Sequence, residues 1–349
     1  MARANWKDYS LRGGGSDVAP DITAAAFDVA IRDQEWYACR IDRQSLKQLT
    51  KRSDKAALVS YGVWLLLLFS SGVAGWFAWG TVWAIPAFGL YSILYSAADH
   101  RNHELSHGTP FRTRWLNETF YHLCAFMTLR EAYYYRWSHS RHHTHTVLVG
   151  RDPELIPRTA PIFAFLLELP FIRSLLMVTW RMAMASTGRI DSDGLQFIPA
   201  NQRRKVIWVS RVYILIMLGT LAACLAAKSI LPAMYIVLPR TFGGILAQIF
   251  NITQHAGLAE DVYDHRLNTR TIVMNPVFTF LYGNMNYHLE HHMFPMVPFY
   301  NLPKLHDLIK DQCPPPYSTW SAIKEVAYAV WRQQKDPSYF VRRELPHPS

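Results

Sequence analysis

An uncharged apolar run begins with Ala56-Ala-Leu-Val-Ser-Tyr-Gly-Val-Trp-Leu-Leu-Leu-Leu68 and extends to residue 76. A second uncharged run, 77–98, follows at once. A second pair of runs lies at 212–227 and 230–251 and is interrupted only by Lys228 and Arg240. Because a helix needs about 20 mainly apolar residues to cross a bilayer, these runs predict four transmembrane helices arranged as two hairpins.

The hairpin tips are expected near Gly80 and Lys228, where the apolar runs are briefly broken. The stretch 162–176 is apolar too, but it contains Glu168, Pro170 and Arg173. We expect this stretch to be interfacial or buried rather than to span a membrane.

Basic residues precede the first and third predicted spans, and they set the expected orientation. They are Arg40, Arg43, Lys47, Lys51, Arg52 and Lys55, and then Arg203, Arg204 and Lys205. Since positive charge stays on the cytoplasmic side, both termini and the segment 100–206 are expected there, in a bacterial inner membrane. The formal net charge of +10 then indicates anionic headgroups and acidic protein partners, and no nucleic acid is expected.

Three short stretches concentrate the histidines. Box one is His103-Glu-Leu-Ser-His107, box two is His139-Ser-Arg-His142-His143, and box three is His288-Leu-Glu-His291-His292. Eight of the 15 histidines lie in these boxes. Residues three and four apart share one face of a helix, so each box aims its imidazoles in one direction.

The boxes indicate a metal centre. Imidazole suits iron, zinc, copper or nickel, and eight such ligands are too many for one ion, so a pair of metals is the simplest solution. Box one also matches His-Glu-x-x-His, a zinc protease motif in which Glu104 would be the general base. A zinc protease needs one further ligand only, and therefore boxes two and three favour the metal pair.

The three boxes, placed between membrane hairpins, resemble the integral-membrane fatty acid desaturase and hydroxylase superfamily. The resemblance covers roughly residues 60 to 310. It includes Asn286-Tyr-His288-Leu-Glu-His291-His292-Met-Phe-Pro295 and Leu302-Pro303-Lys-Leu305. Box one is similar to that of the acyl-lipid and sphingolipid branch, and the compact length is similar to rhizobial enzymes that act on small amphiphiles.

The resemblance implies two iron ions. The ligands would be His103, His107, His139, His142, His143, His288, His291 and His292. Family members often add a ligand after the fourth span, and His255 stands at that place. We expect His100, three residues before box one, to be hydrogen-bonded to solvent at a helix end; the alternative is a group that contacts a metal-bound histidine.

Metal-bound imidazoles usually donate their second N–H to a carboxylate or carbonyl, so acids near the boxes are candidate partners. We expect Glu104, Glu290 and Asp99 to act in this way. The alternative for each is an exposed carboxylate on a polar surface.

Electrons are expected from a separate ferredoxin and its reductase. Cysteines 39, 124, 224 and 313 are scattered and predict no iron–sulfur domain in the chain. Arg136, Arg141, Arg203 and Arg204 could dock an acidic carrier, or they could meet lipid headgroups only.

Together these features predict an all-α membrane protein with four transmembrane helices and a cytoplasmic helical cap that carries the boxes. The expected segments are a polar, partly disordered stretch 1–50, a membrane desaturase domain 51–310, and a C-terminal cytoplasmic helical segment 311–349. The expected activity is oxygen-dependent desaturation of a fatty acyl, lipid-linked chain. The alternatives are hydroxylation or desaturation of an amphiphilic small molecule and, remotely, peptide cleavage by a membrane zinc metalloprotease.

Overall fold

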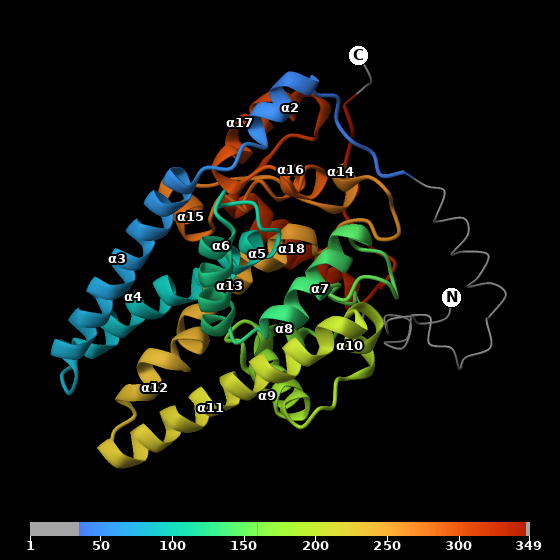
Figure 1. Cartoon of the computed structure of the whole chain (residues 1–349). Coiled ribbons are helices and arrows are strands. Elements are labelled where there is room, and N and C mark those ends of the chain that lie inside the picture. Colours follow the sequence, from blue (N-terminus) through green and yellow to red (C-terminus); the bar gives the residue numbers. More distant parts are fainter. Residues whose placement is uncertain (1–34, 159, 347–349) are drawn as a thin grey trace.

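The computed structural model describes residues 35–158 and 160–346, and its regular structure is almost entirely helical (Figure 1). The longer helices and those of the boxes are α3 (Asp54–Ala78), α4 (Ala84–Ser96), α5 (Ala98–Ser106), α6 (Arg114–Met127), α7 (Ala132–Thr144), α9 (Ile172–Ser186), α11 (Arg203–Ala227), α13 (Pro239–His255), α16 (His288–Met293) and α18 (Thr319–Gln333). Shorter helices are α2 (Arg43–Leu49), α8 (Ile162–Glu168), α10 (Ser192–Phe197), α12 (Leu231–Ile236), α14 (His265–Asn268), α15 (Pro276–Leu281) and α17 (Leu302–Ile309). Three-residue 3₁₀ turns are η2 (Ala200–Gln202), η3 (Phe299–Asn301) and η4 (Lys310–Gln312), and strands β1 (Ile272–Val273) and β2 (Tyr317–Ser318) pair in parallel.

The stretch predicted to be partly disordered is 1–50, and residues 1–34 of it lie outside the described residues. The division into segments 1–50, 51–310 and 311–349 stays a prediction. Within the first of them, α2 is a helix capped by the Asp42 side chain, which accepts a hydrogen bond from the amide of Ser45 at 2.8 Å.

The first hairpin consists of α3 and α4. The Ser53 side chain caps α3, which is long and apolar enough to cross a membrane, with large side chains such as Leu66 and Phe77 exposed. The turn lies at Gly80, whose φ of 83° suits glycine, as expected. The second predicted span is shorter than its apolar run, because the turn takes up residues 79–83 and α4 has only 13 residues. At about 1.5 Å per residue, α4 alone does not cross a hydrocarbon core of about 30 Å.

The second hairpin consists of α11, α12 and α13. The chain leaves α11 at Lys228, which has the left-handed φ of 46°, close to the expected tip. Val237 and Leu238 separate α12 from α13, which begins at Pro239, and the two helices together form an apolar segment long enough to span. At Gly243, α13 packs closely on α4, since an added Cβ would lie 1.8 Å from the carbonyl oxygen of Ser92.

The stretch predicted to be interfacial or buried forms a bent helix pair. Helices α8 and α9 meet at 72° around Pro170 and Phe171, and Phe171 has a left-handed φ of 60°. By length and composition, three helices of the described residues can cross a membrane, or up to four if this bent pair counts as one span. The arrangement of four spans in two hairpins therefore stays a prediction, whereas the mostly helical architecture is confirmed.

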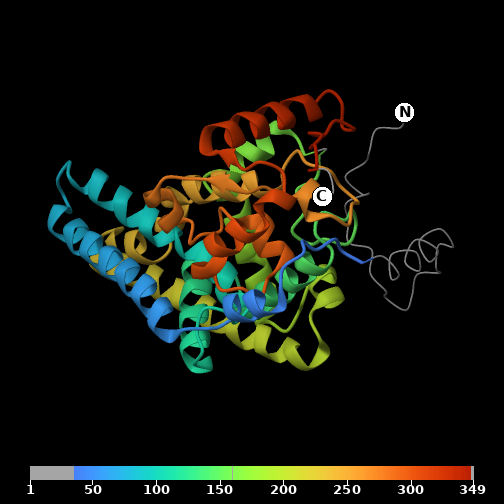
Figure 2. The same ribbon diagram turned by 90° about the horizontal axis from the view of Figure 1, so that it is seen from above.

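Both hairpins project to the same side of the molecule, and the helices of the three boxes lie beyond their other end (Figures 1 and 2). The core there is built from fully buried side chains that include Leu105, Tyr121, Leu289 and Leu305. Two of the scattered cysteines meet in it, with the Sγ atoms of Cys39 and Cys313 at 3.5 Å. This packing connects the segment before α2 to the chain after α17.

Candidate metal centre

Four helices bring the nine predicted ligands together. Box one lies on α5 and its C-cap, box two lies on α7, and box three forms most of α16. His255 is the last residue of α13. Although the four segments are far apart in the sequence, all nine side chains are buried or half-buried at one place.

The nine histidines form two groups. Group A is defined as His103, His107, His139, His143 and His291, and group B as His142, His255, His288 and His292. Within each group, one ring nitrogen from every member lies within 4.8 Å of the others. The groups adjoin, because the rings of His143 and His292 stack with centroids 4.1 Å apart. Each group is a set that could hold one metal ion.

Helical periodicity explains the division. His139 and His143 are four residues apart on α7 and turn to the same side, whereas His142 lies about 60° from His139 and about 100° from His143 around the helix axis. The first pair therefore enters group A, and His142 enters group B. Box three shows the same spacing on α16. His288 and His292, four residues apart, belong to group B, and His291 belongs to group A.

The nitrogen–nitrogen distances fit metal coordination. In group A, Nε2 of His139 lies 3.1 Å from Nε2 of both His107 and His143. In group B, Nε2 of His288 lies 3.1 Å from Nε2 of both His255 and His292. An imidazole nitrogen binds a first-row metal at about 2.1 Å, so two ligands at right angles around one ion lie about 3 Å apart.

Ring nitrogens without a hydrogen-bond partner also fit metal coordination. Both ring nitrogens of His103 and His291 are buried without a hydrogen-bond partner among the described residues. Burial lowers the pKa of both rings well below the usual value, and neighbouring histidines lower it further, so the rings are neutral. A buried, neutral imidazole without a partner has a free lone pair for a metal.

Two carboxylates contact the Nδ1 atoms of two box-two histidines. Nδ1 of His142 lies 2.8 Å from Oδ2 of Asp152, and Nδ1 of His139 lies 3.1 Å from Oε2 of Glu154. Burial disfavours ionisation of Glu154, but the contact with His139 and the charges of His142 and Arg130 together outweigh burial and lower the pKa of Glu154 to about 2. Both Nε2 atoms are thereby turned toward the metal groups.

Sequence reasoning missed Asp152 and Glu154, although they follow box two within 11 residues. The loop reverses at Val147 and Gly150, both with positive φ, and returns the two carboxylates to α7. An acidic pair shortly after a histidine box was the available signal.

Group B has two further supports. Nδ1 of His292 lies 3.1 Å from the Thr146 hydroxyl, and Nδ1 of His255 lies 2.9 Å from the carbonyl oxygen of Asn268. The Asn268 amide in turn donates to the carbonyl of Thr146 at 3.3 Å. These contacts fix the orientation of both rings.

The three carboxylates predicted to contact metal-bound histidines, Glu104, Glu290 and Asp99, are all buried, so the alternative of an exposed carboxylate does not apply to any of them. Oε2 of Glu104 lies 3.7 Å from Nδ1 of His291, while Oε1 accepts from Thr109 and from the amide of Phe299. The roles predicted for Glu104, Glu290 and Asp99 at the metals stay predictions.

Glu290 and Asp99 contact groups outside both histidine sets. Glu290 accepts from Thr271 at 2.7 Å and lies 2.5 Å from Nδ1 of His306. Asp99 forms ion pairs with Arg130 at 3.2 Å and with Arg240 at 2.7 Å. For these two carboxylates the contacts indicate a structural role.

His100 differs from its prediction. Its side chain is buried rather than solvated, and Nε2 lies 3.1 Å from Oδ1 of Asn251, because α13 packs over this face of α5. His265 is buried outside both groups, and its ring stacks on Trp36 at 4.2 Å.

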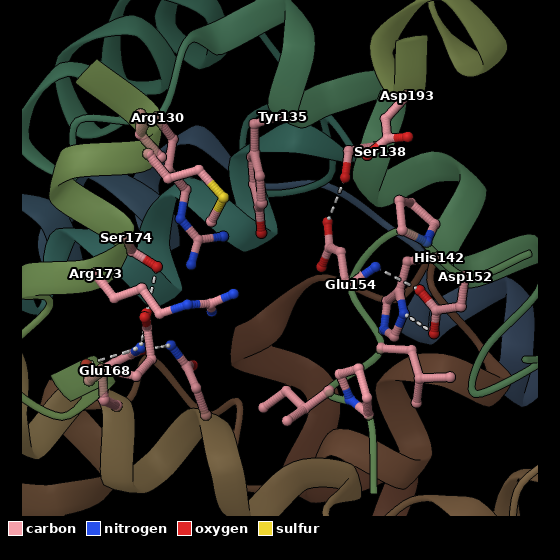
Figure 3. A pocket seen from close by; sticks show the side chains of 18 of the residues that line it. Arg130, Tyr135, Ser138, His142, Asp152, Glu154, Glu168, Arg173, Ser174 and Asp193 are labelled. Atoms are coloured by element: carbon pink, nitrogen blue, oxygen red, sulfur yellow. Dashed lines mark hydrogen bonds and ion pairs between the residues drawn. The ribbon is translucent and has the colours of Figure 1, made fainter. Parts of the chain in front are cut away.

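A cavity of about 1040 Å³ reaches both groups. Its wall includes His103 of group A and His142 and His255 of group B. Figure 3 shows His142, Asp152 and Glu154 on one side of this cavity, facing Arg130 and Arg173 on the other. The remaining wall is largely formed by α8, α9 and the chain segment 153–161.

Three of the four arginines expected to dock an electron carrier are engaged inside the protein. Arg136 forms a bidentate contact with Glu118, at 3.0 and 3.1 Å. Arg141 and Arg203 donate to backbone carbonyls. Docking through this face stays a prediction.

Comparison with known proteins adds independent evidence. A sequence model described as fatty acid desaturase matches residues 97–324, more than half of the chain. A delta(6)-fatty-acid desaturase of Caenorhabditis elegans is 21% identical over 336 residues, which cover 84% of this chain and 73% of that protein. A delta(9) fatty acid conjugase-like enzyme of Dimorphotheca sinuata is 26% identical over 275 residues, covering 70% and 72%. A fatty acid conjugase of Calendula officinalis is 26% identical over 259 residues, covering 65% and 70%. With its histidine clusters and membrane-length helices, the chain belongs to the fatty acid desaturase family and is an oxidoreductase.

Proposed function

We propose that the protein is an oxygen-dependent di-iron desaturase that introduces a double bond into a fatty acyl, lipid-linked chain. The observation that carries this proposal is the cavity of about 1040 Å³, whose wall includes histidines of both groups. A chain in this cavity would pass beside both candidate metal sites. The volume suits a ligand of at least drug size.

Two irons are proposed as the metals. The donor sets are five and four imidazoles, a ligand type that suits iron. When bound, iron with dioxygen supplies the oxidising power to remove hydrogen from an unactivated methylene, which no side-chain acid or base can do. The protein contributes by fixing the rings: Asp152 and Glu154 orient His142 and His139, and Thr146 orients His292.

The wall of the cavity would position the chain. Apolar side chains from the bent pair, including Phe165, Phe171, Met177 and Met182, face the cavity. Flexible methionines adapt to a chain of variable shape. Holding one methylene close to the histidines and excluding water would select the reacting carbon.

Peptide cleavage is not supported by the geometry. His103 and His107 share group A with three more histidines, whereas catalytic zinc usually has three protein ligands. The Glu104 carboxylate, which would be the general base, is buried and bonded to Thr109 and Phe299.

The setting is proposed to be a bacterial inner membrane with the cap on the cytoplasmic side. Electrons are proposed to come from a separate ferredoxin and its reductase. The basic residues before α3 and α11 support this orientation.

Expression in a desaturase-deficient bacterial host with a compatible ferredoxin, followed by mass spectrometry of lipids and metabolites, tests the proposal. The expected result is a loss of two mass units in a fatty acid. A gain of sixteen, or an unchanged lipid pool beside an altered polar metabolite, would instead identify a hydroxylase or an enzyme of amphiphilic small molecules. A His142→Ala variant provides the inactive control.

A further inference from the structure

Five arginines line the cavity, and most are neutralised. Arg130 pairs with Asp99 at 3.2 Å, Arg158 with Glu260 at 2.9 Å, and Arg181 with Asp191 at 2.8 Å. Arg173 and Arg189 have no ion pair or hydrogen bond from their side chains among the described residues. Two cations without an ion pair thus belong to the wall of this cavity.

Arg173 is the one directed toward the reaction site. It lies in the first turn of α9, directly after the bend at Pro170 and Phe171. In Figure 3 its guanidinium extends into the cavity on the same side as Arg130 and opposite Glu154 and His142. The nearby acid Glu168 forms no ion pair with Arg173 among the described residues, and its Oε1 accepts from Gln248 at 2.8 Å and from Ser174.

The surroundings of Arg173 favour an anion. The first turn of α9 contains no acidic residue, and no side chain caps it, so the positive end of the helix dipole adds to the guanidinium charge. A guanidinium offers paired donors that match a carboxylate or phosphate. Arg173 is an exposed residue of the cavity wall, so an anion can reach its guanidinium beside the apolar side chains of Phe171 and Met177.

We propose that Arg173 binds the anionic headgroup, a carboxylate or phosphate, of an amphiphile whose carbon chain extends along the cavity toward His103, His142 and His255. The headgroup could belong to a membrane phospholipid or to a soluble amphiphile, and the chemistry of binding is the same. The inference rests on the proposed function in one respect, namely that this cavity holds the substrate. Headgroup binding at Arg173 would then fix which methylene of the chain lies beside the metals.

The test compares two probes with the same tail, dodecyl phosphate and dodecanol. Equilibrium dialysis measures their binding to the full-length protein in nanodiscs of uncharged lipid. The wild type should bind the phosphate at least about tenfold more tightly than the alcohol, as expected for a charge-assisted contact. Arg173→Gln should bring the two affinities within about twofold of each other, while Arg173→Lys should retain part of the preference.

Arg189→Gln is the matched control, since Arg189 is also an unpaired cation of the cavity wall, just beyond the other end of α9. It should keep the preference. Unchanged dodecanol binding in Arg173→Gln shows that the cavity is intact. Equal affinity of the wild type for both probes, or equal losses in Arg173→Gln and Arg189→Gln, would overturn the proposal.

A second arm identifies the source of the headgroup. Anionic phospholipid added to the nanodisc should compete with dodecyl phosphate in the wild type, but not in Arg173→Gln, if the natural headgroup is a lipid. A retained phosphate preference without lipid competition assigns the site to a soluble amphiphile. Because binding needs no turnover, dehydrogenation that is independent of Arg173 refutes this inference alone, and headgroup binding without dehydrogenation refutes the proposed function alone.

Discussion

Replacing Asp152 by asparagine should weaken metal binding at group B. Oδ2 of Asp152 accepts from Nδ1 of His142 and from the amide of Val147, each at 2.8 Å, while Oδ1 accepts from the amide of Glu154 at 2.8 Å. Asparagine keeps only one oxygen, so whichever way its amide turns, at least one of these donors faces an NH₂ group. The side chain is buried, and water cannot replace the lost acceptor.

The magnitude follows from the charge that is lost. A buried hydrogen bond to a charged group contributes about 1.5–3 kcal/mol, which corresponds to roughly tenfold to hundredfold in an equilibrium constant. Loss of an outer partner of a metal-bound histidine costs about the same factor in metal affinity. Group A retains the Glu154 contact of His139 and should keep its metal.

Iron content after dialysis against increasing chelator measures the effect. Asp152→Asn should lose about half of its iron at a chelator concentration that leaves the wild type intact. Glu290→Gln is the control, because this equally buried carboxylate contacts Thr271 and His306 instead of a member of either group. Equal iron retention in both variants, or a greater loss from Glu290→Gln, would refute the reasoning.

Three further substitutions test other parts of the structure. His255→Ala should reduce oxygen-dependent turnover by more than about tenfold, whereas His265→Ala, outside both groups, should be mild; equal tolerance would remove His255 from the site. Gly243→Ala should lower the melting temperature, since its Cβ would lie 1.8 Å from a carbonyl oxygen of α4 and overpacking costs about 1–3 kcal/mol. Gly62→Ala is the control, because an added Cβ there meets open space and should not lower the melting temperature. Equal melting temperatures of the two variants would contradict the close packing at Gly243. Burial raises the pKa of Glu131 from 4.5 to about 8, so the folded state retains a proton that the unfolded chain releases, and stability falls as the pH rises through this interval. The melting temperature of the wild type should therefore fall relative to Glu131→Gln between about pH 5 and 8, and parallel curves would contradict this.

The membrane helices illustrate what apolar composition predicts and what it omits. The first and third predicted spans appear as α3 and α11, each a continuous helix of 25 residues. The second run predicts one span of 22 residues (77–98), yet the turn around Gly80 uses part of it. Hydropathy counts the apolar residues of a turn, such as Val82 and Trp83, together with those of the helix.

The histidines show a similar limit. Helical spacing predicts that each box aims its imidazoles in one direction, and the family resemblance adds His255. The structure places these nine rings together in two adjoining groups. His142 of box two joins two histidines of box three in group B, and His291 of box three joins two histidines of box two in group A. This assignment depends on how α7 and α16 face each other, which the spacing within one helix does not predict. Asp152 reaches His142 through a loop whose positive φ angles at Val147 and Gly150 are not evident from composition.

Metal analysis of anaerobically purified protein tests the central claim most directly. Two groups of imidazoles predict about two irons per chain, a count that should fall in both His291→Ala of group A and His142→Ala of group B. The same preparation should consume oxygen when it is supplied with a reductant and an acyl substrate. A single zinc per chain, with no oxygen consumption and no dependence on group B, would contradict the account.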